Sequence, residues 1–168
     1  MRSTGEVMGI DRSFSSAFFK ALIGSGLALP KSGSILISLA DEDKSDALEM
    51  VTTLARMGYK LFATEGTAAM IERAGMPVQL TTKRIGRGSP DMLDVILNGT
   101  VDGVINTPGQ ANKDILDGLT IRRAAVERGI PCITSLDTAR TVVDAMEKAA
   151  AMYSVEPIQH YRQETFGY

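Results

Sequence analysis

Short apolar runs alternate with stretches of helical periodicity along most of this chain. The runs include many β-branched residues, and they predict buried strands over residues 34–39, 59–63, 78–82, 101–105 and 130–134. The amphipathic stretches predict helices over residues 13–23, 43–57, 67–74, 91–97, 120–128 and 137–152. Alternating strands and helices build parallel sheets with helices on both faces, so the pattern predicts a three-layer α/β/α fold.

Capping and turn residues mark where these helices begin and end. Either Asp11 or Ser13 is expected to cap the first helix, and Asp137 is expected to cap the last. Helix ends are predicted just before Gly58, Gly75 and Gly129. The apolar face of the helix over residues 43–57 is predicted to comprise Leu48, Val51, Leu54 and Ala55.

A stretch rich in glycine, serine and proline separates the first helix from the rest of the chain. It spans residues 24–33 and predicts a linker at a domain boundary. The helix before it carries an apolar stripe of Phe14, Phe18 and Leu22. This segment either packs its stripe on the domain or on a second copy of the chain, or it is mobile and barely ordered. We expect packing, because water-exposed apolar patches usually mark interfaces. Residues 1–30 are thus the surface through which a homo-oligomer would form.

Composition narrows the class of protein. The chain has 168 residues with 18 basic and 20 acidic side chains, so it predicts one domain with an appendage and no nucleic-acid partner. The chain has a single cysteine, which excludes an internal disulfide framework. It also has a single histidine, and one cysteine and one histidine are too few ligands for a conventional zinc site. The first residues lack the apolar run of a signal peptide, and the apolar runs are short of the ~20 residues that cross a bilayer. We therefore expect a soluble cytoplasmic protein without a membrane partner.

Polar and cationic side chains follow the predicted strands, where ligands bind in open α/β sheets. Residues 64–67 (TEGT) open a helix, whose free N–H groups and positive dipole end suit an anion. Gly66 allows close approach of the backbone, and two lysines add charge-assisted hydrogen bonds. The sequence therefore predicts a site for a small phosphate ester or a nucleotide, formed by Ser38, Lys44, Thr64, Gly66, Thr67, Lys83, Asn106, Thr107 and Thr134.

Several of these residues also have ordinary structural explanations. Thr64 and Thr67 could cap the helix that they open, the lysines could be solvated, and Asn106 could form a turn. Cys132 lies in an apolar strand and is expected to be an inert thiol. The single histidine, His160, lies in the C-terminal tail, and no phosphate-loop motif is present. The sequence accordingly predicts no catalytic residue.

Five motifs occur at residues 3–9 (STGEVMG), 34–44 (SILISLADEDK), 62–68 (FATEGTA), 104–107 (VINT) and 117–123 (DGLTIRR). Together they resemble the C-terminal part of the carbamoyl-phosphate synthase large subunit, over roughly residues 1–157. The resemblance implies that residues 1–30 end the preceding ATP-grasp unit, which forms carbamoyl phosphate. It further implies that residues 31–157 form a methylglyoxal-synthase-like allosteric domain and that residues 158–168 form a tail.

The resemblance also implies the sheet order and the ligands. The five parallel strands would lie in the order 3-2-1-4-5, and the domain would bind UMP as an inhibitor or IMP as an activator. The positions that match the family's phosphate and ribose contacts are Ser38, Lys44, Thr64, Thr67, Lys83, Asn106 and Thr107, with Asp117, Thr120 and Ile121 nearby, while Thr134 matches an ornithine contact. Pro108 replaces a threonine of the family pattern and one residue is inserted after Lys83, so the sequence leaves the effector open.

The resemblance implies a regulatory role for this chain and catalysis by its parent. The chain alone would hold no cofactor or metal. The parent ligase would make carbamoyl phosphate from bicarbonate, glutamine-derived ammonia and ATP with Mg or Mn, for pyrimidine and arginine biosynthesis. Its partners would be the rest of the large subunit and the glutaminase small subunit. The alternatives are methylglyoxal synthase, which needs an aspartate where Ser89 stands, the IMP cyclohydrolase half of a purine enzyme, or another phosphate-binding protein of this fold.

Overall fold

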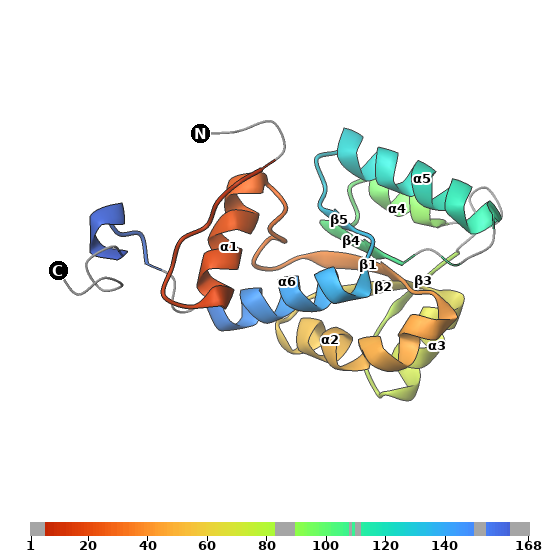
Figure 1. The fold of residues 1–168 in the computed structure, drawn as a ribbon. Helices are drawn as coiled ribbons and strands as arrows, with labels where there is room; N and C mark the ends of the chain where they lie inside the picture. Colours follow the sequence, from red (N-terminus) through yellow and green to blue (C-terminus); the bar gives the residue numbers. More distant parts are fainter. Residues whose placement is uncertain (1–5, 83–89, 108, 110–111, 150–153, 162–168) are drawn as a thin grey trace. The chain divides into compact units, whose positions relative to one another are not determined.

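The computed structural model describes residues 6–82, 90–107, 109, 112–149 and 154–161 (Figure 1). It divides into two compact units, one of residues 29–140 and one of residues 1–28 with 141–168. The strands are β1 (Ser34–Ser38), β2 (Lys60–Thr64), β3 (Gln79–Thr81), β4 (Gly103–Asn106) and β5 (Cys132–Ile133). The helices are α1 (Phe14–Ser25), α2 (Lys44–Arg56), α3 (Glu65–Arg73), α4 (Met92–Leu97), α5 (Asn112–Glu127) and α6 (Leu136–Ala149), with a 3₁₀ turn η1 (Asp41–Asp43) before α2.

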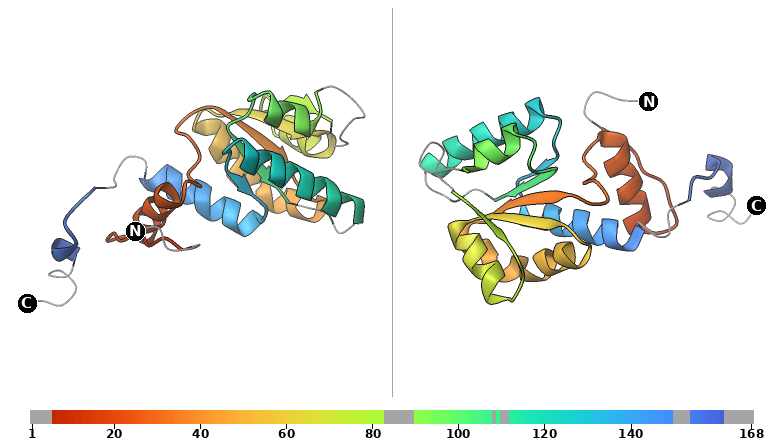
Figure 2. Two further views of the ribbon diagram at one scale, coloured as in Figure 1. Left: turned by 90° about the horizontal axis from the view of Figure 1, so that it is seen from above. Right: turned by 180° about the vertical axis from the view of Figure 1, so that it is seen from behind.

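The strands of the larger unit form one parallel sheet in the order β3-β2-β1-β4-β5. This confirms the predicted fold class and strand order. Helices α4 and α5 lie on one face of the sheet, and α2 and α3 lie on the other (Figures 1 and 2). The central strand β1 is covered on both faces, which explains why its apolar run is uninterrupted by polar residues until Ser38.

Alternate residues of each strand build two cores. Leu36, Phe62 and Val104 pack with apolar residues of α4 and α5 on one face. The intervening residues, such as Ile35 and Ile37, are fully buried and point to the opposite face, where α2 and α3 lie. Because successive side chains of a strand point to opposite faces, the same alternation also decides toward which face the last residue of each strand points.

Some predicted element boundaries are wrong. Helix α5 begins at Asn112 instead of residue 120, because Gly118 in this stretch disfavours a helix and the few apolar residues before it were not recognised as a helical face. Strands β3 and β5 are shorter than predicted, since only their central residues pair with a neighbour. Helix α6 begins at Leu136, so Asp137 lies in its first turn and does not cap it. The backbone carbonyl of Ser135 instead accepts the Ala139 N–H at 3.0 Å, which places Ser135 at the cap position.

The apolar face of α2 also differs from the prediction. Its buried residues are Ala47, Met50, Val51 and Leu54, whereas Leu48 is exposed. Leu48 lies about 100° around the helix from Ala47, which is enough to turn it from the sheet toward the gap between α2 and α3. The prediction was right for Val51 and Leu54 and wrong for Leu48.

The smaller unit joins the two ends of the chain. Ser13 caps α1 by accepting the Ser16 N–H at 3.1 Å, which confirms one of the two predicted caps. The Arg12 guanidinium donates two hydrogen bonds to the Glu156 carboxylate, one to each oxygen and each 3.1 Å long. Lys20 donates to the Tyr161 hydroxyl at 2.9 Å. Part of the predicted tail is therefore attached to the N-terminal segment by charged hydrogen bonds.

Candidate functional site

A row of polar residues crosses the whole sheet where the strands end. The register pairs Thr64 with Thr81 and Ser38 with Asn106. It also pairs Ile37 with Ala63 and Ile105 with Ile133, so the next residues along these strands are neighbours as well. The row, from β3 to β5, is Thr81, Thr64, Ser38, Asn106 and Thr134. The core residues Phe62, Leu36 and Val104, which face α4 and α5, come two residues before Thr64, Ser38 and Asn106. Because side chains alternate between the two faces of a sheet, the polar row lies on the same face as these core residues.

Hydrogen bonds hold the centre of the polar row in place. The Thr64 hydroxyl donates to the Ser38 hydroxyl at 3.3 Å. The hydroxyl of Thr67 accepts the Leu39 N–H at 3.0 Å, and that of Thr107 accepts the Ala40 N–H at 2.9 Å. These two bonds fix the backbone that leaves β1, so the predicted residues of β1, α3 and β4 are joined in one network.

The start of α3 keeps its capacity for an anion. Thr64 occupies the cap position of α3, but its side chain makes no capping hydrogen bond to the helix. The alternative that Thr64 simply caps the helix is therefore wrong, and Thr67 serves the backbone after β1 instead. The N–H groups at the beginning of an uncapped helix point outward with the positive end of the helix dipole.

Lys44 lies directly against this helix start. A Cβ atom placed on Gly66 would be 2.5 Å from the Lys44 Nζ, so the ammonium occupies space that only glycine leaves open. Lys44 is also paired with Asp41, whose side chain is almost fully exposed. Because an exposed partner is weakly held in water, an incoming anion can replace it at little cost.

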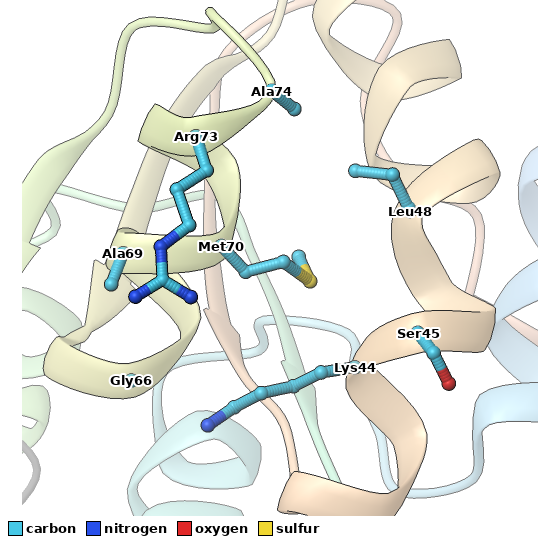
Figure 3. A pocket seen from close by; sticks show the side chains of 8 residues that line it. All are labelled: Lys44, Ser45, Leu48, Gly66, Ala69, Met70, Arg73 and Ala74. Atoms are coloured by element: carbon cyan, nitrogen blue, oxygen red, sulfur yellow. The ribbon is translucent and has the colours of Figure 1, made fainter.

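Lys44 and Gly66 also border a cavity of about 550 Å³ between α2 and α3. Figure 3 shows the side chains that line it. The side chains of Leu48 and Met70 point toward its interior, and the Arg73 guanidinium lies along the α3 side. The corrected position of Leu48 is explained by this cavity, because Leu48 lines it.

A second, polar cavity of about 430 Å³ lies at the β5 end of the row. Thr107 and Thr134 line it together with three carboxylates, Asp43, Asp46 and Asp137. Arg140 partly balances these charges, since its guanidinium lies 3.9 Å from the carboxylates of both Asp46 and Asp137. Thr134 thus has acidic neighbours that its position in the sequence did not reveal.

The remaining predicted site residues are distributed differently. Lys83, like Pro108 and Ser89, lies outside the described residues. Helix α5 carries Asp117 half-buried, Thr120 exposed and Ile121 in the core that faces the sheet. Cys132 is partly buried, and burial raises the pKa of its thiol, with Arg122 opposing the shift.

Thr81 is the member of the polar row that the sequence did not single out. Its position inside an expected strand, 78–82, gave no reason to treat it as a site residue. The signal that identifies it is its pairing with Thr64, which depends on the register of two strands.

The parallel sheet in the order β3-β2-β1-β4-β5, with helices on both faces and polar residues where its strands end, defines a three-layer α/β/α domain (Figure 1). The profile of the MGS-like domain family matches residues 46–134, which is more than half of the chain. The chain therefore belongs to the MGS-like domain family.

Its curated relatives are more specific. The carbamoyl phosphate synthase large chain of Thermomicrobium roseum is 53% identical over 96% of this chain and 15% of its own length. The carbamoyl phosphate synthase large chain, C-terminal section, of Methanopyrus kandleri is 42% identical over 88% of this chain and 27% of its own length. The chain thus corresponds to a small part of these relatives, and the resemblance to this family is confirmed.

Solved structures agree on the fold. Methylglyoxal synthase from Elizabethkingia anophelis superposes with a TM-score of 0.52 at 20% identity, covering 68% of this chain and 79% of that one. ForH superposes with a TM-score of 0.53 at 18% identity, covering 77% and 85%. At such low identity these structures establish a shared fold only. None of the helices among the described residues has the length and apolar character of a membrane span.

Proposed function

We propose that this chain is the effector-binding domain of a carbamoyl-phosphate synthase large chain, and that its ligand is a nucleoside monophosphate such as UMP or IMP. The observation that carries the proposal is the convergence of Lys44, the uncapped start of α3 and the polar row at one edge of the sheet. Membership of the MGS-like family and the large-chain relatives support the assignment.

The phosphate would bind where the positive charges meet. Lys44 and the N–H groups of Gly66 and Thr67 supply the donors, and phosphate dianions are favoured at such helix starts. Ser38 and Asn106 lie next along the row, where their hydroxyl and amide groups can bind the ribose. Lys83, which follows β3 in the sequence, would add a second cation.

Regulation would work by linkage. A ligand that binds one arrangement of the domains better than another shifts their equilibrium toward that arrangement. In the proposed parent, this shift would alter the synthesis of carbamoyl phosphate from bicarbonate, glutamine-derived ammonia and ATP with Mg or Mn. The partners would be the rest of the large subunit and the glutaminase small subunit.

A second ligand is favoured by the polar cavity at β5. Its three carboxylates beside Thr134 suit a cationic amino acid, and ornithine has the two amino groups and the carboxylate that such a mixed site can bind. This supports the predicted role of Thr134 as an ornithine contact. Ornithine and the nucleotide would then share Thr107, because this residue lines the polar cavity and is also bonded to the backbone after β1 beside the nucleotide site.

Calorimetric titration of the chain with UMP, IMP, uridine and ornithine tests the proposal. UMP should bind at least about tenfold more tightly than uridine, because a charge-assisted hydrogen bond contributes about 1.5–3 kcal/mol. Lys44→Ala should remove most of this difference. Lys60→Ala is the matched control, since Lys60 is the first residue of β2 and lies at the other end of that strand from Thr64. Equal affinity for UMP and uridine would overturn the proposal.

The methylglyoxal synthase alternative has its own test. General acid–base chemistry needs a titratable group within reach of the proton that it moves. By the resemblance, methylglyoxal synthase needs an aspartate where Ser89 stands and a histidine before its penultimate helix, and the single histidine of this chain is His160. We therefore expect no methylglyoxal from dihydroxyacetone phosphate above the uncatalysed rate. Turnover that Asp91→Asn abolishes would favour the enzyme instead.

A further inference from the structure

Thr81 has a buried hydroxyl without a hydrogen-bond partner among the described residues. The residue is 0% exposed and ends β3, at the edge of the sheet. A buried hydroxyl normally has a partner, because leaving it unpaired forfeits the hydrogen bonds it made to water. Its neighbour Thr82 is bonded through the backbone to Pro90 and Met92, so the strand end itself is well anchored.

The register directs this hydroxyl toward the proposed phosphate site. Thr81 is paired with Thr64, and directly paired residues of parallel strands present their side chains to the same face. Neighbouring strands lie about 4.7–4.9 Å apart, and hydroxyl hydrogen bonds span about 2.7–2.8 Å. A phosphate oxygen that binds beside Thr64 therefore lies within hydrogen-bond reach of the Thr81 hydroxyl.

We propose that Thr81 is a further ligand-binding residue of this site, and that its hydroxyl donates a hydrogen bond to a phosphate oxygen of the nucleotide. This inference rests on the proposed function. Without ligand the hydroxyl is buried and has no hydrogen-bond partner in the described part of the chain, and with ligand it is satisfied. Thr64 and Ser38 differ from it, because their hydroxyls are already bonded to each other.

The proposal predicts opposite orders of stability and affinity in two variants. Thr81→Val removes the hydroxyl while keeping the shape, so the ligand-free protein should melt at the same or a higher temperature. Thr81→Ser keeps the hydroxyl but removes a buried methyl group, so it should melt at a lower temperature. Binding should follow the hydroxyl alone, and should be retained in Thr81→Ser and reduced in Thr81→Val. A purely structural role would move stability and affinity in the same direction.

The experiment is titration of the full chain with UMP, inorganic phosphate and uridine, together with thermal unfolding. Thr81→Val should bind UMP and phosphate about tenfold or more weakly than the wild type, with uridine affinity unchanged. Thr81→Ser should stay within about threefold, as should the control Thr52→Val, whose hydroxyl donates to the Leu48 carbonyl of its own helix.

The outcomes separate this inference from the proposed function. Wild-type protein that binds none of UMP, IMP and phosphate overturns the proposed function and this assignment with it. Wild-type protein that binds UMP while Thr81→Val binds it equally well overturns the assignment alone. A Thr81→Val variant that loses both affinity and stability also overturns it, because the hydroxyl would then serve the fold.

Discussion

Replacing Gly66 with alanine separates the stability of α3 from the position of Lys44. Gly66 is the second residue of α3, and its backbone conformation is compatible with any residue. An added Cβ would lie 2.5 Å from the Lys44 Nζ and 3.5 Å from its Cε. The ammonium is the end of a flexible side chain, so it can move away without disturbing the backbone.

The two effects of this substitution have opposite signs. Alanine is favoured over glycine in a helix by about 0.5–1 kcal/mol, which corresponds to a rise of about 1–4 °C in the melting temperature of a chain this long. Moving Lys44 away from the helix start weakens a charge-assisted hydrogen bond to the phosphate, which lowers UMP affinity by about tenfold or more. The variant should therefore be more stable and bind less.

Gly24→Ala is the matched control. Gly24 lies in α1, where an added Cβ would meet only the Val7 Cβ, at 4.0 Å. This variant should gain a similar amount of stability and bind UMP like the wild type. Thermal unfolding and calorimetric titration of both variants measure the two effects. If Gly66→Ala binds UMP as tightly as the wild type, Lys44 is not held at the helix start for the ligand and the reasoning fails.

Two further predictions concern the smaller unit. The hydrogen bond from Lys20 lowers the pKa of Asp11 despite opposing burial, so its stabilisation is complete above the unfolded-state pKa and is lost as the pH falls through the folded-state value. Hydrogen exchange of the α1 amides should show Asp11→Asn less protected than the wild type at pH 7, with the difference shrinking below about pH 4; a constant difference would contradict this. Deleting residues 1–28 should expose the segment around Glu156 to proteases, because Arg12 and Lys20 are removed. The deletion should also lower the oligomeric state in solution, because Phe14 is 72% exposed and is expected to join two copies of the chain. An unchanged oligomeric state would refute the interface, and an unchanged cleavage pattern would refute the attachment of the Glu156 segment.

The shortened chain begins at residue 29 for a structural reason. Leu29 is buried, and its Cδ2 lies 2.5 Å from where a Cβ on Gly103 would be. The hydroxyl of Tyr59 also donates to the Pro30 carbonyl. These two linker residues pack in the larger unit, whereas the assignment of residues 1–30 to a preceding synthetase unit stays a prediction.

Local sequence was sufficient for the elements of this fold. Apolar periodicity and capping residues predicted every strand and helix of the sheet layers, because such signals act over a few residues. The position of Lys44, Thr64, Gly66 and Asn106 near the carboxyl ends of the strands was also predictable, since it follows from the order of strands and helices, whereas their role as site residues stays a prediction. Periodicity was not recognised at the start of α5, where Gly118 disfavours a helix.

Tertiary structure decided what the sequence left ambiguous. Whether Thr64 caps α3, whether Leu48 faces the sheet, and which acids surround Thr134 all depend on neighbours that are distant in the chain. Thr81 shows the reason most clearly, because its residue type and its strand were both evident from the sequence. Only the pairing of β3 with β2 placed its unpaired hydroxyl beside Thr64, and a shift of one residue in that register would have turned it to the other face.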